Sequence, residues 1–355
     1  MQEKNIAPNE EIKIVPPNEV QFGAQTRRVM WIDFSKVICI YLVALGHALS
    51  YEVTNECYLR NFIYLFHLPV FFFISGYLYR IKDNEKNFLS YSLSNLNSLV
   101  IPYIFLNVLA VILMFPSLLH HDIKPLLYNF LIGHGHAPAG PAWFLLCLYW
   151  TKIQMFFIIR LDDKMQLLSA LFYCILAYYF PFHLYWEIDA SFMAMPIFIL
   201  GNLIKKHYSD CINGHYSPFT MSSLFLISFA ITVCLSVIQQ KEAMFSRLFG
   251  TYAILFYVGA ISGIIMIVSL CKLLENNNNR HVIRLASGSI IIMGLHGIFY
   301  RYTHGVFNKL LVEVPLDYMI LFKIVICLIV LAEMYWPIIF LQKYCSQFLG
   351  GRKVA

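Results

Sequence analysis

Apolar residues are grouped along the chain in stretches of about 17 to 25 positions, the length that crosses a bilayer as a helix. Only a helix satisfies its own backbone hydrogen bonds within such a stretch in lipid. The pattern therefore predicts an all-α, polytopic integral membrane protein with about ten transmembrane helices. The predicted spans are residues 30–51, 61–79, 98–118, 141–159, 166–182, 190–204, 219–238, 250–272, 285–303 and 317–341.

The composition supports this class. Hydrophobic residues make up 59% of the chain and charged residues only 13%, against roughly 25% charged residues in soluble domains. The mean hydropathy is +0.64. These values exclude soluble enzymes, secreted disulfide scaffolds and disordered chains. The nine cysteines form no C-x-x-C pair and are interpreted as core residues. The net charge of +6 comes without a dense basic run, so we predict no nucleic-acid partner.

Lysine and arginine are unevenly distributed between the predicted loops. With the N-terminus in the cytoplasm, the cytoplasmic segments hold roughly three times as many basic residues as the outer segments, which agrees with the positive-inside rule. We therefore predict cytoplasmic termini and a multi-pass protein of the bacterial cytoplasmic (inner) membrane. The predicted units are a disordered tail over 1–29 without a cleaved signal peptide, a transmembrane domain over 30–342 and a cytoplasmic tail over 343–355.

Three ionisable or charged residues lie within the first predicted span, where such groups are costly and mark function by default. Lys36 and His47 are eleven residues apart, which brings them within about 20° of one helix face and about 16 Å apart along the axis. Asp33, one turn before Lys36, belongs to the same face. The arrangement favours a catalytic role for these three side chains along one face of the helix. The plainer alternative is an Asp33–Lys36 pair that anchors the helix end, with His47 at the outer interface.

Two further histidines lie toward the outer ends of their predicted spans. His67 precedes Pro69 in the second span, at the depth of His47, and His296 lies in the ninth span. Imidazole titrates near neutral pH, so neighbouring histidines at one depth indicate a proton-transfer site. Zinc binding is the alternative, but no single helix carries an H-x-x-x-H pair, and we predict no metal.

Other polar residues in the spans either line a cavity or join helices. Glu333, deep in the last span, is the candidate for a cavity. The candidates for helix-to-helix contacts are Asn107, Lys152, Gln154, Asn202 and Lys323. The outer loop 119–140 carries His134 and His136 in a Gly-Pro stretch. Such loops often line substrate entrances, although a plain surface loop is the commoner case.

These motifs resemble the acyltransferase 3 family, close to its fucose 4-O-acetylase-like members. The first span matches the family pattern of a basic residue, ten positions and a histidine, with Asp33 in the usual acidic position before Lys36. The stretch FHLPVFFFISGYL in the second span is the most specific match. The further matching positions are His67, Pro69, Phe72, Ser75, Gly76, Pro102, Tyr103, Trp143, Phe144, Leu145, Gly201 and His296. The resemblance covers nearly the whole transmembrane region, and we expect no additional esterase-like domain.

The resemblance implies an integral membrane O-acyltransferase that moves an acetyl or larger acyl group from cytosolic acyl-CoA to a hydroxyl of a cell-envelope or exopolysaccharide glycan. His47 would be the base or a transient acyl carrier, Lys36 would contact the donor, and Asp33 would orient Lys36. The implied substrate-binding residues are His67, Ser75, Trp143, His296 and Glu333. The implied partners are acetyl-CoA or another acyl-CoA, a glycan or lipid-linked sugar acceptor, and membrane lipid.

One departure from the family pattern concerns the donor site. Many members carry two arginines, three positions apart, shortly before the third-helix proline, and these are associated with acyl-CoA. Here the corresponding stretch is Asn95 to Ser98, and the nearest bases are Arg80, Lys82 and Lys86. Either these bases meet the CoA phosphates instead, or the donor is bound in a different way.

A transporter or flippase for a lipid-linked glycan is the alternative function, because it too would place charges within its helices. The sequence shows neither the repeated halves nor the paired broken helices that alternating access uses. The acyltransferase is therefore the favoured interpretation.

Overall fold

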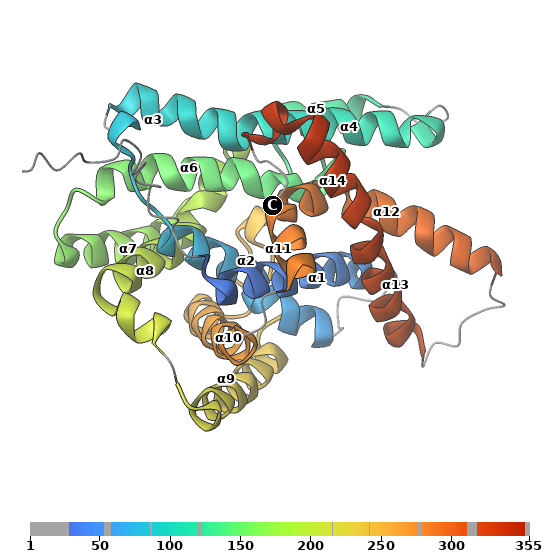
Figure 1. The fold of residues 1–355 in the computed structure, drawn as a ribbon. Helices are drawn as coiled ribbons and strands as arrows, with labels where there is room; N and C mark the ends of the chain where they lie inside the picture. The colour runs from blue at the N-terminus through green and yellow to red at the C-terminus, as the bar shows by residue number, and fades with distance from the viewer. Residues whose placement is uncertain are drawn as a thin grey trace, which may run out of the picture.

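The computed structural model describes residues 28–52, 58–85, 87–118, 123–214, 216–240, 242–275, 279–310 and 318–351. These residues form helices joined by short connections (Figure 1), with one isolated β-bridge between Ala243 and Leu248. The α-helices are α1 (Met30–Glu52), α2 (Tyr58–Tyr77), α3 (Phe88–Asn95), α4 (Ile101–Leu118), α5 (Lys124–Ile132), α6 (Trp143–Ile158), α7 (Asp163–Tyr179), α8 (Ile188–Asn213), α9 (Pro218–Ile238), α10 (Ala253–Leu274), α11 (Arg280–Ser287), α12 (Ser289–Leu310), α13 (Met319–Glu333) and α14 (Tyr335–Tyr344). The short helices are η1 (Asp83–Glu85), the π-helical η2 (Leu96–Val100), η3 (Gly140–Ala142), η4 (Tyr185–Glu187), η5 (Met244–Ser246) and η7 (Ser346–Leu349).

The predicted all-α membrane class is confirmed. Eight helical segments of the described residues are long and apolar enough to cross a membrane, and the bent pair α11–α12 makes a ninth if it counts as one span. The predicted span 166–182 corresponds to α7, whose 17 residues extend only about 26 Å, short of the roughly 30 Å hydrocarbon core. The eight to nine candidate spans among the described residues compare with the predicted count of about ten, and α7 is a predicted span that falls outside these candidates. The orientation of the termini stays a prediction, and the predicted tail 1–29 lies outside the described residues except at its end.

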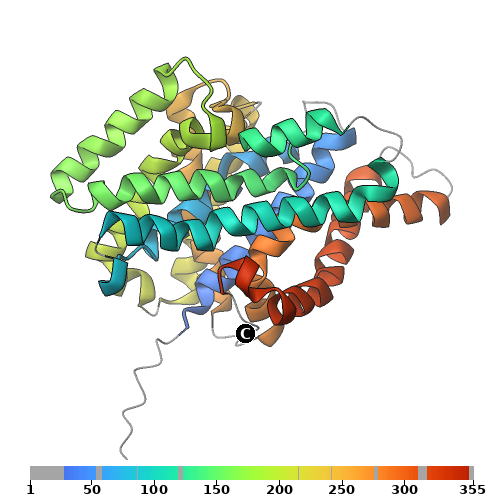
Figure 2. The ribbon, with the colours of Figure 1, turned by 90° about the horizontal axis from the view of Figure 1, so that it is seen from above.

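Helices α1 and α2 lie at the centre of the molecule (Figure 1; Figure 2), where α2 packs against α8, α10 and α1. α1 also contacts α12 and α13. Side chains along α2, among them Phe66 and Phe72, are completely buried. The motif-bearing second span therefore faces protein on most of its sides, which is where polar side chains in a membrane helix can be accommodated.

Two glycines allow α2 and α8 to touch. A Cβ atom on Gly76 would lie 2.0 Å from the carbonyl oxygen of Phe198, and a Cβ on Gly201 would lie 2.2 Å from that of Phe73. Small residues of this kind let two membrane helices approach with their backbones in contact. The contact fixes the position of α2, and with it the neighbouring Ser75.

The chain bends sharply between α11 and α12, by 81°. Gly288 at the bend packs against Ile338 of α14, where an added Cβ would lie 2.4 Å from the side chain. Ser287, Ser289 and Ile290 at the bend line a cavity of about 1130 Å³. Backbone that departs from helical geometry at membrane depth is tolerated where it lines a cavity. The bend between α11 and α12 does line a cavity.

Candidate active site

A cavity of about 1130 Å³ lies among the described residues. It is bordered by α1, α2, the continuous α3–η2–α4 helix, α6 and the bend between α11 and α12. Its basic lining residues are Arg28, Lys36, Arg80, Lys82 and Lys152, against one acidic residue, Glu85. A cavity of this size with an excess of positive charge suits a large anion with several charges. We call it the basic cavity.

Lys36, one of the three predicted catalytic residues, lines the basic cavity together with Ser75 of α2. Asp33 is buried and accepts hydrogen bonds from Arg28, from Nε at 2.5 Å and from a terminal guanidinium nitrogen at 3.4 Å. Arg28 also donates to the carbonyl oxygen of Ile283 on α11, at 3.3 Å. Asp33 therefore orients Arg28, which is itself part of the cavity lining.

Lys152 reaches the basic cavity from α6, and its Nζ donates to the side-chain oxygen of Asn95 at 3.2 Å. Asn95 lies where α3 passes into the π-helical η2, and it donates to the carbonyl oxygen of Tyr91 at 2.9 Å. π-helical turns are frequent at functional positions. Asn95 and Asn97, which stand where the resemblance led us to look for arginines, both line this cavity beside Lys152.

Glu85, the acidic residue of the lining, is engaged in local hydrogen bonds. Its carboxylate accepts from Ser94 Oγ at 2.5 Å and from Lys82 Nζ at 3.1 Å. Burial opposes ionisation, but these hydrogen bonds outweigh it and lower the pKa of Glu85. Glu85 is therefore a carboxylate at neutral pH that offsets part of the positive charge and leaves the cavity basic.

A second pocket, of about 40 Å³, lies further along α1 and holds the predicted histidines. It is lined by His47 of α1, His67 and Tyr64 of α2, and Trp143 of α6. The ring centre of His296 on α12 lies 5.5 Å from that of His47. Tyr64 lies 6.5 Å from His47 and 5.1 Å from His67. Three predicted site residues, His47, His67 and Trp143, thus line what we call the histidine pocket, and a fourth, His296, lies next to His47.

Hydrogen bonds to carbonyl oxygens define the tautomers of two of these histidines. The Nδ1 atom of His67 lies 2.7 Å from the carbonyl oxygen of Ile63, and that of His296 lies 2.9 Å from the carbonyl oxygen of Ile292. Because a carbonyl oxygen only accepts, each Nδ1 carries the proton, and each neutral ring keeps a lone pair on Nε2. The buried Nε2 of His296 has no hydrogen-bond partner among the described residues. Such atoms are suited to accept a proton or a hydroxyl hydrogen.

Aromatic rings separate the two sites. Phe71 and Phe144 line the basic cavity, and their ring centres are 5.8 Å apart. Trp143 lines the histidine pocket, with its ring centre 6.5 Å from that of Phe144. Helix α1 runs past both sites and contributes Lys36 to one and His47 to the other. One helix therefore links a basic cavity to a pocket of proton acceptors.

The remaining polar residues of the spans lie elsewhere. Glu333 lines a third cavity of about 400 Å³ beside α12, where it accepts from Thr303 Oγ1 at 2.8 Å, so it is separate from the other predicted substrate-binding residues. Gln154 donates to Ser191 of α8 at 2.7 Å, and the buried Lys323 donates to a carbonyl oxygen of α1 at 3.3 Å. Both are helix-to-helix contacts. In the described ranges, no group of three His, Cys, Asp or Glu side chains could hold a metal ion.

Sequence reasoning missed three residues of these sites. Arg28 belongs to the predicted tail 1–29, yet it lines the basic cavity. Tyr64 lies one helical turn before His67, so helical spacing could have identified it. Phe245 of η5 lines the histidine pocket, and no motif marks it in the sequence.

The comparisons with known proteins bear on this arrangement. The acyltransferase 3 family, whose conserved unit is described as an acyltransferase domain, matches residues 29–334. The chain belongs to this family. The Nodulation protein NolL of Sinorhizobium fredii is 31% identical to it over 170 residues, which cover 45% of this chain and 44% of NolL. The matched region is thus less than half of that relative's length. No solved structure matches the chain.

The family match extends over the described helices from α1 to α13. It includes the histidine pocket and most of the lining of the basic cavity, but not Arg28. The resemblance to the acyltransferase 3 family is therefore confirmed.

Proposed function

We propose that this membrane acyltransferase moves an acetyl group from cytosolic acetyl-CoA to a hydroxyl of a cell-envelope or exopolysaccharide glycan. The observation that carries the proposal is that Lys36 and His47 lie on one helix and line two different sites. The basic cavity suits the charged donor, and the histidine pocket suits the hydroxyl. The basic cavity faces the cytoplasm of a bacterial inner membrane in this proposal, because the distribution of lysine and arginine favours a cytoplasmic start of α1.

The basic cavity offers phosphate partners that take the place of the missing arginine pair. Arg80 and Lys82 border it after α2, and Lys152 borders it from α6. Cationic side chains of this kind form charge-assisted hydrogen bonds with phosphate oxygens. The phosphates of CoA would bind to these three residues, Lys36 and Ser75 would contact the arm that carries the acyl group, and the thioester end would reach past Phe144 toward His47.

The transfer itself requires a base at the acceptor. In the proposed step, His47 accepts the proton of the acceptor hydroxyl while the hydroxyl oxygen attacks the thioester carbonyl carbon. The carbon–sulfur bond breaks, the new ester bond forms, and the sulfur takes up the proton and leaves as CoA thiol. His67 lines the same pocket and would hold the hydroxyl, and His296, which lies against His47, would hold the His47 ring in position.

A transfer assay tests this function. Purified protein in lipid nanodiscs is incubated with radiolabelled acetyl-CoA and with the polysaccharide fraction of the source organism's cell envelope, stripped of esters by mild alkali. The wild-type protein should label the glycan. His47→Ala should lower the rate by about 10²- to 10⁴-fold, the usual contribution of a general base. Lys36→Ala should lower it by about tenfold or more, because a hydrogen bond from a charged group is lost.

Exposed residues provide matched controls. Lys164 on α7 and His281 on α11 are exposed and line neither site, so their alanine variants should keep the wild-type rate. If wild-type protein leaves all of the label on CoA, the proposed function is wrong. If a folded His47→Ala variant transfers at the wild-type rate, His47 is not the base.

A further inference from the structure

Two segments that are far apart in the sequence converge over the histidine pocket. The connection before α6 brings His134, His136 and Pro141, and the turn η5 brings Phe245. The Phe245 ring centre lies 6.1 Å from that of Trp143, 5.7 Å from that of His134 and 5.9 Å from that of His136. Pro141, Trp143 and Phe245 line the pocket directly. We call Trp143, Phe245, His134 and His136 the outer ring cluster.

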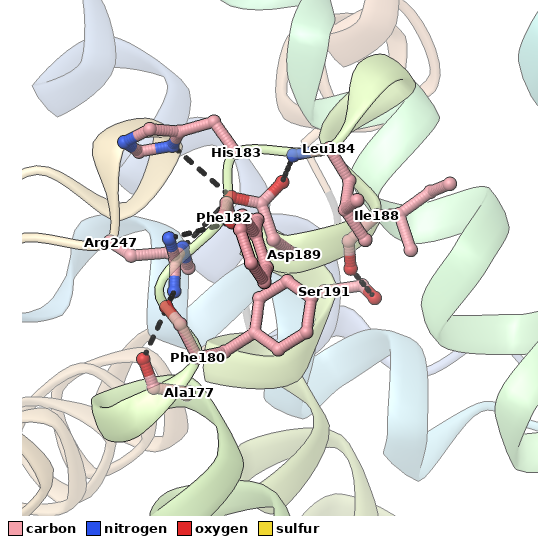
Figure 3. Close-up of polar contacts among 9 residues, drawn as sticks. All are labelled: Ala177, Phe180, Phe182, His183, Leu184, Ile188, Asp189, Ser191 and Arg247. Carbon is pink, nitrogen blue, oxygen red and sulfur yellow. Dashed lines mark hydrogen bonds and ion pairs between the residues drawn. The ribbon is translucent and has the colours of Figure 1, made fainter.

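A buried ion pair holds one side of the outer ring cluster (Figure 3). Arg247, directly after η5, donates from Nε to Asp189 at 2.8 Å, and the exposed fractions of the two side chains are 8% and 4%. Arg247 also donates to the carbonyl oxygens of Phe180 at 2.5 Å and Phe182 at 2.9 Å. The second Asp189 oxygen accepts from the Leu184 amide at 3.1 Å. The turn η5 is thereby fastened to the connection between α7 and α8.

Backbone conformation and close packing fix the other contacts of the cluster. Arg247 has a φ of 52°, a left-handed conformation that is uncommon for a residue with a side chain and is often found at functional sites. A Cβ on Gly135 would lie 3.1 Å from the Phe245 ring, so the absence of a side chain lets the histidine segment approach. Asn107 of α4 accepts from the amide of Ala139 at 3.0 Å. Both segments that carry the outer ring cluster, the one before α6 and the turn η5, are therefore held in place by contacts within the protein.

The rings provide both apolar and polar contacts. Trp143 is buried and Phe245 half-buried, and both rings line the histidine pocket. Burial and the neighbouring His136 lower the pKa of His134, so His134 is neutral at neutral pH. Its Nδ1 accepts weakly from the His136 amide at 3.4 Å, which leaves a proton on Nε2. A neutral imidazole can donate to a hydroxyl group without adding a charge.

We propose that the outer ring cluster is the acceptor subsite, in which a pyranose ring of the glycan stacks on Phe245 and Trp143 and donates or accepts hydrogen bonds at His134 and His136. The inference rests on the proposed function and names the acceptor of that site as a sugar ring. Binding sites of this kind combine apolar and aromatic walls with a few polar groups that set the orientation of the ligand. A ring held there would direct one hydroxyl toward His47.

Binding and turnover are measured separately to test this subsite. Saturation-transfer-difference NMR records binding of the ester-stripped envelope polysaccharide to the protein in nanodiscs, without any donor present. The transfer assay gives the KM for the same glycan and for acetyl-CoA. Phe245→Ala should weaken the NMR signal of the sugar-ring protons and raise the glycan KM at least about tenfold, a loss of about 1.4 kcal/mol, while the KM for acetyl-CoA stays within about twofold.

Matched variants separate the subsite from a structural role. Phe245→Tyr keeps the ring and should retain binding, and His134→Ala should raise the glycan KM less than Phe245→Ala. Tyr252 is in the same loop but 59% exposed; Tyr252→Ala should behave like the wild type.

Two outcomes would overturn the subsite. The first is a Phe245→Ala variant that thermal unfolding shows to be folded and that has an unchanged glycan KM and an unchanged NMR signal. The absence of any glycan signal with wild-type protein also overturns it. Glycan binding through Phe245 without label transfer supports the subsite and contradicts the proposed function.

Discussion

The imidazole of His296 lies against that of His47, with ring centres 5.5 Å apart, although the two residues come from α12 and α1. His296 is 1% exposed, and its Nε2 has no hydrogen-bond partner among the described residues. An unsatisfied polar atom of this kind costs about 1–3 kcal/mol of folding free energy. In the proposed function, the acceptor hydroxyl would supply the hydrogen bond that this nitrogen lacks.

We therefore expect His296→Phe to lower the kcat of acyl transfer by about ten- to hundredfold, because a hydrogen bond to the reacting group is lost. The substitution keeps a planar ring and removes the unsatisfied nitrogen, so the thermal midpoint should not fall. Steady-state kinetics and thermal unfolding in nanodiscs measure the two effects. A variant with wild-type kcat would show that His296 serves packing alone.

Lys152 is expected to contribute to donor affinity. Lys152→Ala should raise the KM for acetyl-CoA by about tenfold or more, since charged hydrogen bonds contribute about 1.5–3 kcal/mol, and Lys152→Arg should recover part of the loss. The glycan KM should stay unchanged. Lys164→Ala removes the same charge from the exposed surface of α7 and is the control. Equal effects of both alanine variants would indicate a general electrostatic effect in place of a phosphate contact.

Glu242 makes stability depend on pH. It is 1% exposed, with both carboxyl oxygens unpartnered within the described residues, and burial raises its pKa to about 7. The folded state binds the proton of the Glu242 carboxyl group more tightly than the unfolded state does. The contribution of Glu242 to the free energy of unfolding is therefore present at low pH and is lost as pH rises through about 7. Glu242→Gln should therefore gain thermal stability relative to the wild type between about pH 5 and pH 8. A difference that is independent of pH would contradict the assignment.

The ion pair between Arg247 and Asp189 is expected to stabilise the fold as well as position η5. Arg247→Ala removes the guanidinium beside the buried Asp189 carboxylate and leaves it the Leu184 amide and His183, whose Nδ1 lies 3.3 Å away. Removing one partner of a buried pair typically costs about 3–5 kcal/mol. We expect a lower thermal midpoint for this variant. The double variant Arg247→Met with Asp189→Leu leaves no isolated charge and should be less destabilised than Arg247→Ala alone. A larger fall of the thermal midpoint in the double variant would show that the hydrogen bonds of Arg247 to carbonyl oxygens stabilise the fold more than its ion pair with Asp189 does.

Gly76 is expected to tolerate no side chain. In Gly76→Ala the new Cβ would meet the carbonyl oxygen of Phe198 at 2.0 Å, so α2 and α8 would have to separate. We expect a loss of folded protein in size-exclusion chromatography. Gly297 on α12 has no atom within 4 Å of the corresponding position, and Gly297→Ala should remain folded. Similar yields of the two variants would contradict the close approach of α2 and α8.

Helical periodicity was sufficient to predict the main features of α1 and α2. The spacing of Lys36 and His47 along one helix is local and follows from residue rotation and rise. Their assignment to one helix face is compatible with both residues lining cavities, and His67 lies in the same pocket as His47. The predicted span 166–182 ends three residues beyond α7, because the apolar run continues through Phe180 after the helix ends at Tyr179.

The sequence by itself determined the membrane class, the helical content and the local stripes of charged and polar residues, because these depend on composition and on contacts within one helix. Only the tertiary structure decided that Asp33 orients Arg28, that Glu333 lies in a separate cavity, and that Phe245 reaches His134. These relationships depend on packing between segments far apart in the chain, for which no local period exists. Aromatic loop residues in particular show their role only once the fold has brought them over the histidine pocket.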